Sequence, residues 1–173
     1  MLDRRGALGL WPLLALAGCG TSRAPRIAGV PAPGGFEDIS CVPYARARSG
    51  LTLRGDAWQW WDAAAGRYAR ARRPEPGAVL VLARTGRLPQ GHVAVVARVT
   101  GPREIRVDHA NWASGRDKGR VARDQPVLDV SAGNDWSLVR VWFPPAGDYG
   151  TSQFAAHGFV GPNRKAEYKE GEI

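Results

Sequence analysis

The stretch GHVAVVARVTGPREIRVDHANW, residues 91–112, decides the fold of this chain. It contains two runs rich in β-branched residues, 92–99 and 104–112, joined by a segment with adjacent glycine and proline. Runs of this kind separated by turn residues are typical of a β-hairpin. The stretch therefore predicts two neighbouring antiparallel strands, the first of which begins with a histidine.

The register of this hairpin predicts which side chains meet. If Thr100 pairs with Arg103 across the turn, His92 lies opposite Asn111 and His109 lies one pleat further along. Directly opposed side chains of an antiparallel pair share a face of the sheet. We therefore expect His92, His109 and Asn111 to lie together on one face.

Helices are predicted before the hairpin, and further strands on both sides of it. Capping residues and glycines mark the helix ends, and β-branched runs mark the strands. We expect helices at 41–48 and 57–65, and strands at 78–83, 92–99, 104–112 and 138–143. Helices followed by a run of strands predict an α+β fold, with the N-terminal helices packed on an antiparallel β-sheet. Trp136 and Trp142 are expected to pack in its core.

Cys41 is the candidate nucleophile, because it lies at the predicted start of a helix. Unpaired N–H groups and the helix dipole lower a thiol pKa at such a position, and a nearby imidazolium from His92 would lower it further. A thiol, a base and a group that orients the base form a nucleophilic site. Either Asn111 or His109 is expected to orient His92. We favour Asn111 because an amide needs no particular protonation state, whereas His109 must be neutral to accept a hydrogen bond, so activity that depends on it should fall below about pH 6.5.

The N-terminus resembles a bacterial lipoprotein signal. Arg4 and Arg5 precede an apolar run at 6–17, which is too short to span a membrane but suits the core of a signal peptide. The run leads into Leu-Ala-Gly-Cys at 16–19, which resembles the lipoprotein box, where the chain is cut before the cysteine and the thiol is acylated. We expect a signal peptide at 1–18, a membrane anchor through lipid on Cys19, and a flexible tether at 19–35.

The chain has two cysteines, so whether Cys19 is lipidated decides whether Cys41 has a possible disulfide partner. If Cys19 carries lipid, Cys41 is a lone thiol in an oxidising compartment, which indicates reactivity. If Cys19 is not lipidated, a Cys19–Cys41 disulfide is the alternative.

Composition indicates one folded, basic domain. The chain has 24 Lys and Arg against 16 Asp and Glu, a net charge of +8, and the arginines are scattered. Export argues against a nucleic-acid partner, so the charge fits solvated arginines or an anionic envelope polymer. We expect a monomer with one domain and a C-terminal extension at 36–162, followed by a polar tail at 163–173.

Several segments resemble the CHAP domain, the cysteine, histidine-dependent amidohydrolase/peptidase. They are residues 41–46, 55–57, 76–81, 91–96 and 107–112. The resemblance implies a papain-like fold that cleaves amide bonds in peptidoglycan, with Cys41 at the nucleophile position and His92 at the base position. Family members often have Glu-x-Asn before the tryptophan, where this chain has His109-Ala110-Asn111. The glutamate that usually orients the base is therefore absent.

These observations predict a thiol-dependent amidase or endopeptidase that acts on peptidoglycan. Its expected place is the bacterial cell envelope, lipid-anchored and facing the periplasm, or secreted. No metal or cofactor is expected, because the chain lacks CxxC, HExxH and His-x-His spacings. The alternative is a catalytically weak or inactive CHAP-like lipoprotein that binds cell-envelope polymers.

Overall fold

The computed structural model describes residues 39–112 and 118–161. The predicted signal peptide, the lipidation residue Cys19, the tether and the polar tail lie outside these residues. Within the described ranges, no helix is both long and apolar enough to cross a membrane.

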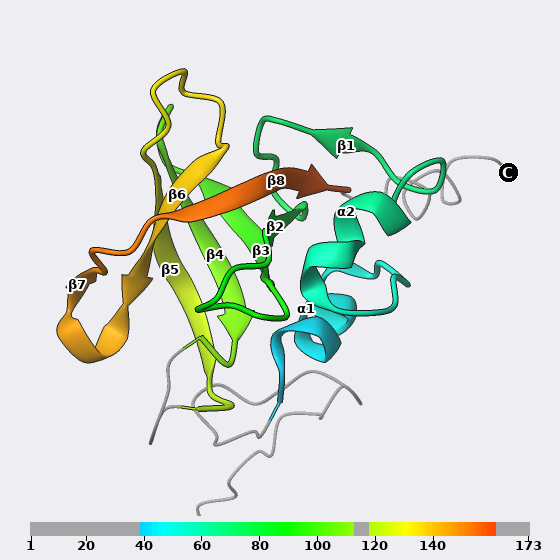
Figure 1. The fold of residues 1–173 in the computed structure, drawn as a ribbon, viewed down its shortest axis with the longest axis horizontal. Helices are drawn as coiled ribbons and strands as arrows, with labels where there is room; N and C mark the ends of the chain where they lie inside the picture. Colours follow the sequence, from blue (N-terminus) through cyan, green and yellow to red (C-terminus); the bar gives the residue numbers. More distant parts are fainter. Residues whose placement is uncertain (1–38, 113–117, 162–173) are drawn as a thin grey trace, which may run out of the picture.

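Short helices come first in the chain, and strands make up the rest of the fold (Figure 1). The helical elements are α1 (Cys41–Ser49), a 3-10 turn at Ala57–Gln59, α2 (Trp60–Ala63) and a second 3-10 turn at Pro144–Ala146. The strands are β1 (Arg70–Ala71), β2 (Val79–Leu82), β3 (His92–Val99), β4 (Glu104–Ala110), β5 (Val121–Asp129), β6 (Leu138–Phe143), β7 (Asp148–Tyr149) and β8 (Phe154–Val160).

The predicted α+β fold, with an N-terminal helix packed on an antiparallel sheet, is confirmed. Helix α1 matches its prediction to within one residue, but the predicted helix at 57–65 is only a 3-10 turn followed by α2. The sequence pattern gives no signal for β5 and β8. β5 contains charged residues and a proline, and β8 contains a glycine and small residues, all of which weaken strand propensity. The segment expected as an extension of the domain is thus part of the sheet.

The sheet closes on itself. Its strand order is β1-β8-β2-β3-β4-β5-β6-β7, and β8 pairs with β6 as well as with β2. Strands β2 to β6 and β8 therefore surround one core, and the helices lie on its outside, α1 against β3 and β4 and α2 against β8 (Figure 1).

β2 and β3 are buried on both faces. Leu80 and Leu82 point into the core enclosed by the strands, whereas Val79 and Val81 pack against the helices and contact the cluster that contains Trp60. Each fully buried Val or Leu side chain contributes roughly 1.5–3 kcal/mol of hydrophobic stabilisation. The two strands are thus held from both sides, which fixes the strand that begins with the predicted base.

The β3–β4 hairpin departs from the predicted register near its turn. Val99 pairs with Ile105, so the expected Thr100–Arg103 pairing is wrong. A β-bulge between Val96 and Arg98 takes up the extra residue, and beyond it the register is the predicted one. The bulge explains why the histidines still share a face although the turn is longer than expected.

Candidate active site

Cys41 occupies the first residue of α1. The preceding Ser40 is extended, Pro43 lies in the first turn where its missing N–H is harmless, and Gly50 ends the helix in a left-handed conformation. The Cys41 side chain is half-buried and lines a cleft of about 400 Å³. The same cleft is lined by His92 and Asn111, so the fold brings the predicted nucleophile and base to one opening.

Gly91 sets the position of the predicted base. Its φ of +67° lies in the left-handed region, and a Cβ there would lie 2.7 Å from the carbonyl oxygen of Leu82 and 2.8 Å from Trp58. Only glycine fits this close approach without strain. The next residue, His92, begins β3 with its side chain almost fully buried. This glycine was not among the predicted site residues, although its place directly before the histidine is visible in the sequence.

His109 is the side chain that contacts His92. Nε2 of His92 lies 3.1 Å from Nδ1 of His109, and the two rings meet edge to face. This contact leaves Nδ1 of His92 as the ring nitrogen available to the thiol. His109 is fully buried, and its own Nε2 has no hydrogen-bond partner among the described residues.

Trp112 covers the histidine pair. Its ring centroid lies 4.7 Å from that of His92 and 5.7 Å from that of His109, and it stacks nearly parallel to the latter. Phe154 of β8 meets the same indole edge-on. These apolar contacts keep water away from the hydrogen bond between the imidazoles, where it would otherwise compete for the ring nitrogens.

Asn111 makes other hydrogen bonds than the one to His92 that we expected. It has a φ of +58°, a conformation that asparagine tolerates better than most residues, and it lies just beyond the end of β4. Its N–H donates to the carbonyl of Arg120, and its Oδ1 accepts from the N–H of Gly119, both at 2.9 Å. This geometry favours His109 over the preferred Asn111 as the orienting group, because the turn directs the side-chain oxygen of Asn111 to the N–H of Gly119.

Burial keeps both imidazoles neutral. It lowers the pKa of His92 well below the ordinary value of 6.5, and the nearby His109 lowers it further. It also lowers the pKa of His109 to about 4, against a weaker opposite effect of Asp108. The expectation that His109 stops accepting a hydrogen bond below about pH 6.5 is thus corrected: with a pKa of about 4, the ring stays neutral at pH 6.5 and becomes protonated only near pH 4.

Burial also has the largest effect on the pKa of the Cys41 thiol. It raises the pKa of Cys41 above its ordinary value, and the backbone N–H groups of Val93 and Val42 lower it by less. The expectation of a thiolate stabilised by the helix start is therefore not met in the resting site. A neutral thiol beside a neutral imidazole needs proton transfer to His92 at the moment of attack.

A buried carboxylate links α1, which carries the candidate nucleophile, to β4, which carries His109. Asp108 Oδ2 accepts a hydrogen bond from Arg48 Nε of α1 at 3.1 Å, and Oδ1 accepts from the N–H of Asp124 at 2.9 Å. Asp124 lies next to the bulge between β4 and β5. Arg48 is nearly half exposed and Asp108 is buried, so loss of Arg48 would leave a buried carboxylate with one partner fewer. This link joins α1 to β4.

Metal ligands do not gather in the described ranges. There, no three His, Cys, Asp or Glu side chains are close enough to form a metal-binding group.

The sequence of this region also matches a known family. Residues 32–111 match the CHAP domain. The family consists of cysteine- and histidine-dependent amidohydrolases and peptidases that typically act on peptidoglycan. The match includes Cys41, His92, His109 and Asn111, and it ends directly before Trp112. No curated protein matches the chain.

Proposed function

We propose that this protein is a thiol-dependent hydrolase of amide or peptide bonds in peptidoglycan. One observation supports this most strongly: Cys41, at a helix start, opens into the same cleft as His92, whose Nε2 is held by a buried partner. The CHAP match supplies the reaction class and the typical substrate.

In the proposed reaction, Nδ1 of His92 takes the proton of the Cys41 thiol as the sulfur attacks the carbonyl carbon. The carbonyl oxygen becomes an oxyanion, and backbone N–H groups at the start of α1 are its donors. The tetrahedral intermediate collapses, the C–N bond breaks, and His92 gives its proton to the leaving amine. Water, deprotonated by His92, then cleaves the thioester and returns the thiol.

His109 is the proposed orienting group. With its proton on Nε2, its Nδ1 accepts a hydrogen bond from Nε2–H of His92, which aims the lone pair of Nδ1 at Cys41. A neutral imidazole stabilises the His92 imidazolium less than a carboxylate would. We therefore expect the pKa of His92 to be lower than that of the base in family members with glutamate. His92 should for this reason release its proton more readily.

Digestion of purified peptidoglycan tests the proposal. The wild-type protein should release soluble fragments whose masses identify the broken amide bond, and Cys41→Ser should release none because its hydroxyl is not ionised near neutrality. His157→Gln, which changes a histidine of β8 outside the cleft, is the matched control and should keep full activity. Equal release by wild type and Cys41→Ser would refute the mechanism.

A second candidate function is binding of envelope polymers without catalysis. Two observations favour it: the raised thiol pKa and the replacement of the family's glutamate by His109. A protein that sediments with peptidoglycan but releases no fragment over a long digestion would support this function. The same digestion thus separates the two candidates.

The proposed location is the bacterial cell envelope, with the protein anchored through lipid on Cys19 and facing the periplasm. The ordered signal, apolar core and cysteine support it, together with the Gly- and Pro-rich segment that would let the domain reach its substrate. The proposed domain limits are 36–162.

A further inference from the structure

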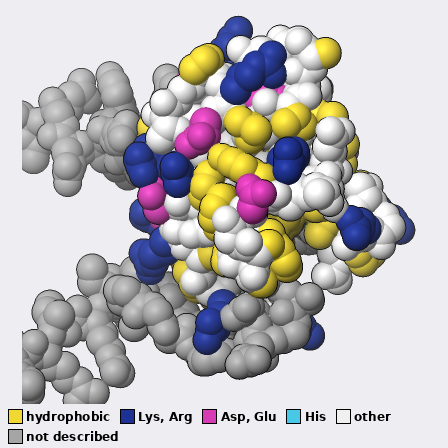
Figure 2. Space-filling view, turned by 90° about the vertical axis from the view of Figure 1, so that its left-hand side faces the viewer, with side chains coloured by type: hydrophobic (Ala, Val, Ile, Leu, Met, Phe, Trp, Pro, Cys, Tyr) yellow, Lys and Arg dark blue, Asp and Glu magenta, His cyan; other side chains and the backbone are white. Residues whose placement is uncertain are grey.

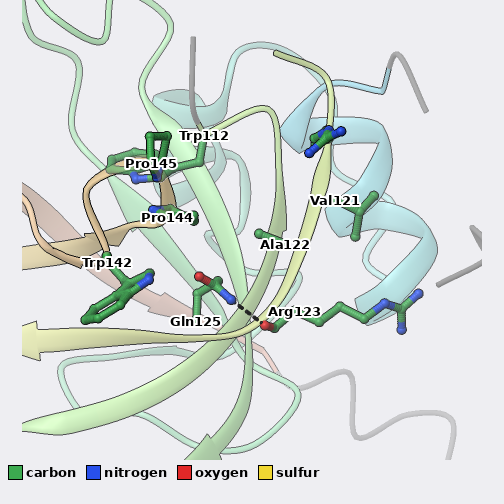
Figure 3. Close-up of a pocket in the computed structure, with 10 residues that line it drawn as sticks. Trp112, Val121, Ala122, Arg123, Gln125, Trp142, Pro144 and Pro145 are labelled. Atoms are coloured by element: carbon green, nitrogen blue, oxygen red, sulfur yellow. Dashed lines mark hydrogen bonds between the residues drawn. The ribbon is translucent and has the colours of Figure 1, made fainter. Parts of the chain in front are cut away.

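A second hollow lies beside the cleft and takes no part in the proposed chemistry. This groove, here called the β5–β6 groove, has a volume of about 640 Å³ (Figure 3). Its lining includes Trp112, Trp142, Pro144, Pro145, Arg120 and Gln125. Figure 2 shows the side of the molecule on which β7 lies, where hydrophobic side chains gather across the middle of the face.

The groove neighbours the active-site cleft, because consecutive residues line the two hollows. Trp112 borders the groove and packs against His92, with ring centroids 4.7 Å apart. Asn111 lines the cleft, and its N–H donates at 2.9 Å to the carbonyl of Arg120, which lines the groove. Asn111 lines the cleft and Trp112 the groove, so a polymer cut at Cys41 would extend past these two residues into the groove.

The groove is lined by aromatic rings and by one hydrogen-bond acceptor that has no partner among the described residues. Trp142, expected in the core, is instead half-buried, and its aromatic contact is an edge-on one with Tyr149. Oε1 of Gln125 is buried and has no hydrogen-bond partner among the described residues, whereas its Nε2 donates to the carbonyl of Arg123 at 2.6 Å. Figure 3 shows this oxygen turned away from Arg123, toward Pro144 and the interior of the groove.

We propose that the β5–β6 groove binds the glycan strand of the polymer whose amide bond is cut in the cleft. This inference rests on the proposed function. A sugar ring has a C–H face that stacks on indole rings, and hydroxyl and acetamido N–H groups at its edge. Those edge groups donate to an acceptor such as Oε1 of Gln125. An occupant without hydrogen-bond donors would leave that oxygen buried without a partner, at the cost of its desolvation.

Binding of chitohexaose, a soluble sugar oligomer without peptide, tests the inference. The parent protein carries Cys41→Ser, so that binding is measured without hydrolysis, by titration calorimetry. Trp142→Ala should raise the Kd at least about tenfold, equivalent to about 1.4 kcal/mol. Gln125→Leu, of similar volume, should raise it severalfold. Trp61→Ala is the control, because Trp61 lies on the helical side between Arg70 and Arg72, and it should leave the Kd unchanged.

The outcomes separate this inference from the proposed function. Unchanged affinity in both groove variants overturns the inference even if wild-type protein digests peptidoglycan. Displacement of chitohexaose by a sugar-free peptide from peptidoglycan also overturns it, because the groove would then hold the peptide. Weakened binding in both variants supports the groove even if no amide bond is cut, in which case only the hydrolase proposal fails.

Discussion

Replacing His109 by glutamine should remove a large part of the acid sensitivity of this protein. His109 is fully buried, and burial lowers its pKa from 6.5 to about 4. The unfolded chain therefore binds a proton more tightly than the folded protein. The stability linked to this group is complete above pH 6.5 and is lost as the pH falls toward 4.

The size of the effect follows from the pKa difference. Each unit of pKa corresponds to 1.36 kcal/mol, so the wild-type protein should lose about 3 kcal/mol of unfolding free energy through His109 between pH 7 and pH 4. Glutamine has no proton to gain. The difference in stability between wild type and His109→Gln should therefore shrink by about 3 kcal/mol over this range, whatever its value at pH 7.

Urea unfolding followed by tryptophan fluorescence measures this difference at each pH. Titrating groups outside the histidine pair are common to both proteins and cancel in the subtraction; replacing His109 also removes its effect on the pKa of His92, which burial still holds low. Asn111→Ala is the control, because it changes a neighbouring side chain that does not titrate, and its difference from wild type should not depend on pH. A constant difference between wild type and His109→Gln from pH 7 to pH 4 would refute the neutral, buried imidazole.

Four further results are expected. His109→Ala should lower kcat roughly a hundredfold and Asn111→Ala less than tenfold, because only the former contacts the base; the reverse order of kcat values would contradict the orienting role. Alkylation of Cys41 by iodoacetamide should accelerate with pH into the alkaline range, since burial raises the thiol pKa; a rate already maximal at pH 7 would instead show a thiolate. Gly91→Ala should destabilise the fold by roughly 1–3 kcal/mol through backbone strain, measured by the same urea titration; an unchanged midpoint would argue against the close approach. Cys19→Ser should move the protein from the detergent phase to water on phase partitioning, and equal partitioning of both forms into water would count against lipidation.

The local sequence determined the elements that carry the chemistry. The helix that begins at Cys41 and the strand that begins at His92 can be predicted from the sequence, because proline and glycine mark the ends of the elements and β-branched residues mark the strand. Short-range patterns of this kind depend on backbone preferences and need no knowledge of distant contacts. They also sufficed to place His92 and His109 on one face of a hairpin.

The tertiary structure decided how the site is completed. The contact of His92 with His109, and not with Asn111, depended on the left-handed turn at Asn111, which has no clear mark in the sequence, while a β-bulge restored the register that keeps both histidines on one face. The neutral state of Cys41 and of the imidazoles depends on burial, and burial depends on strands such as β8 that are contributed from far along the chain. The types of residues and their spacing in the sequence determine which chemistry is available. The protonation states and hydrogen-bond partners of those residues are set by desolvation and packing, which exist only once the sheet has closed.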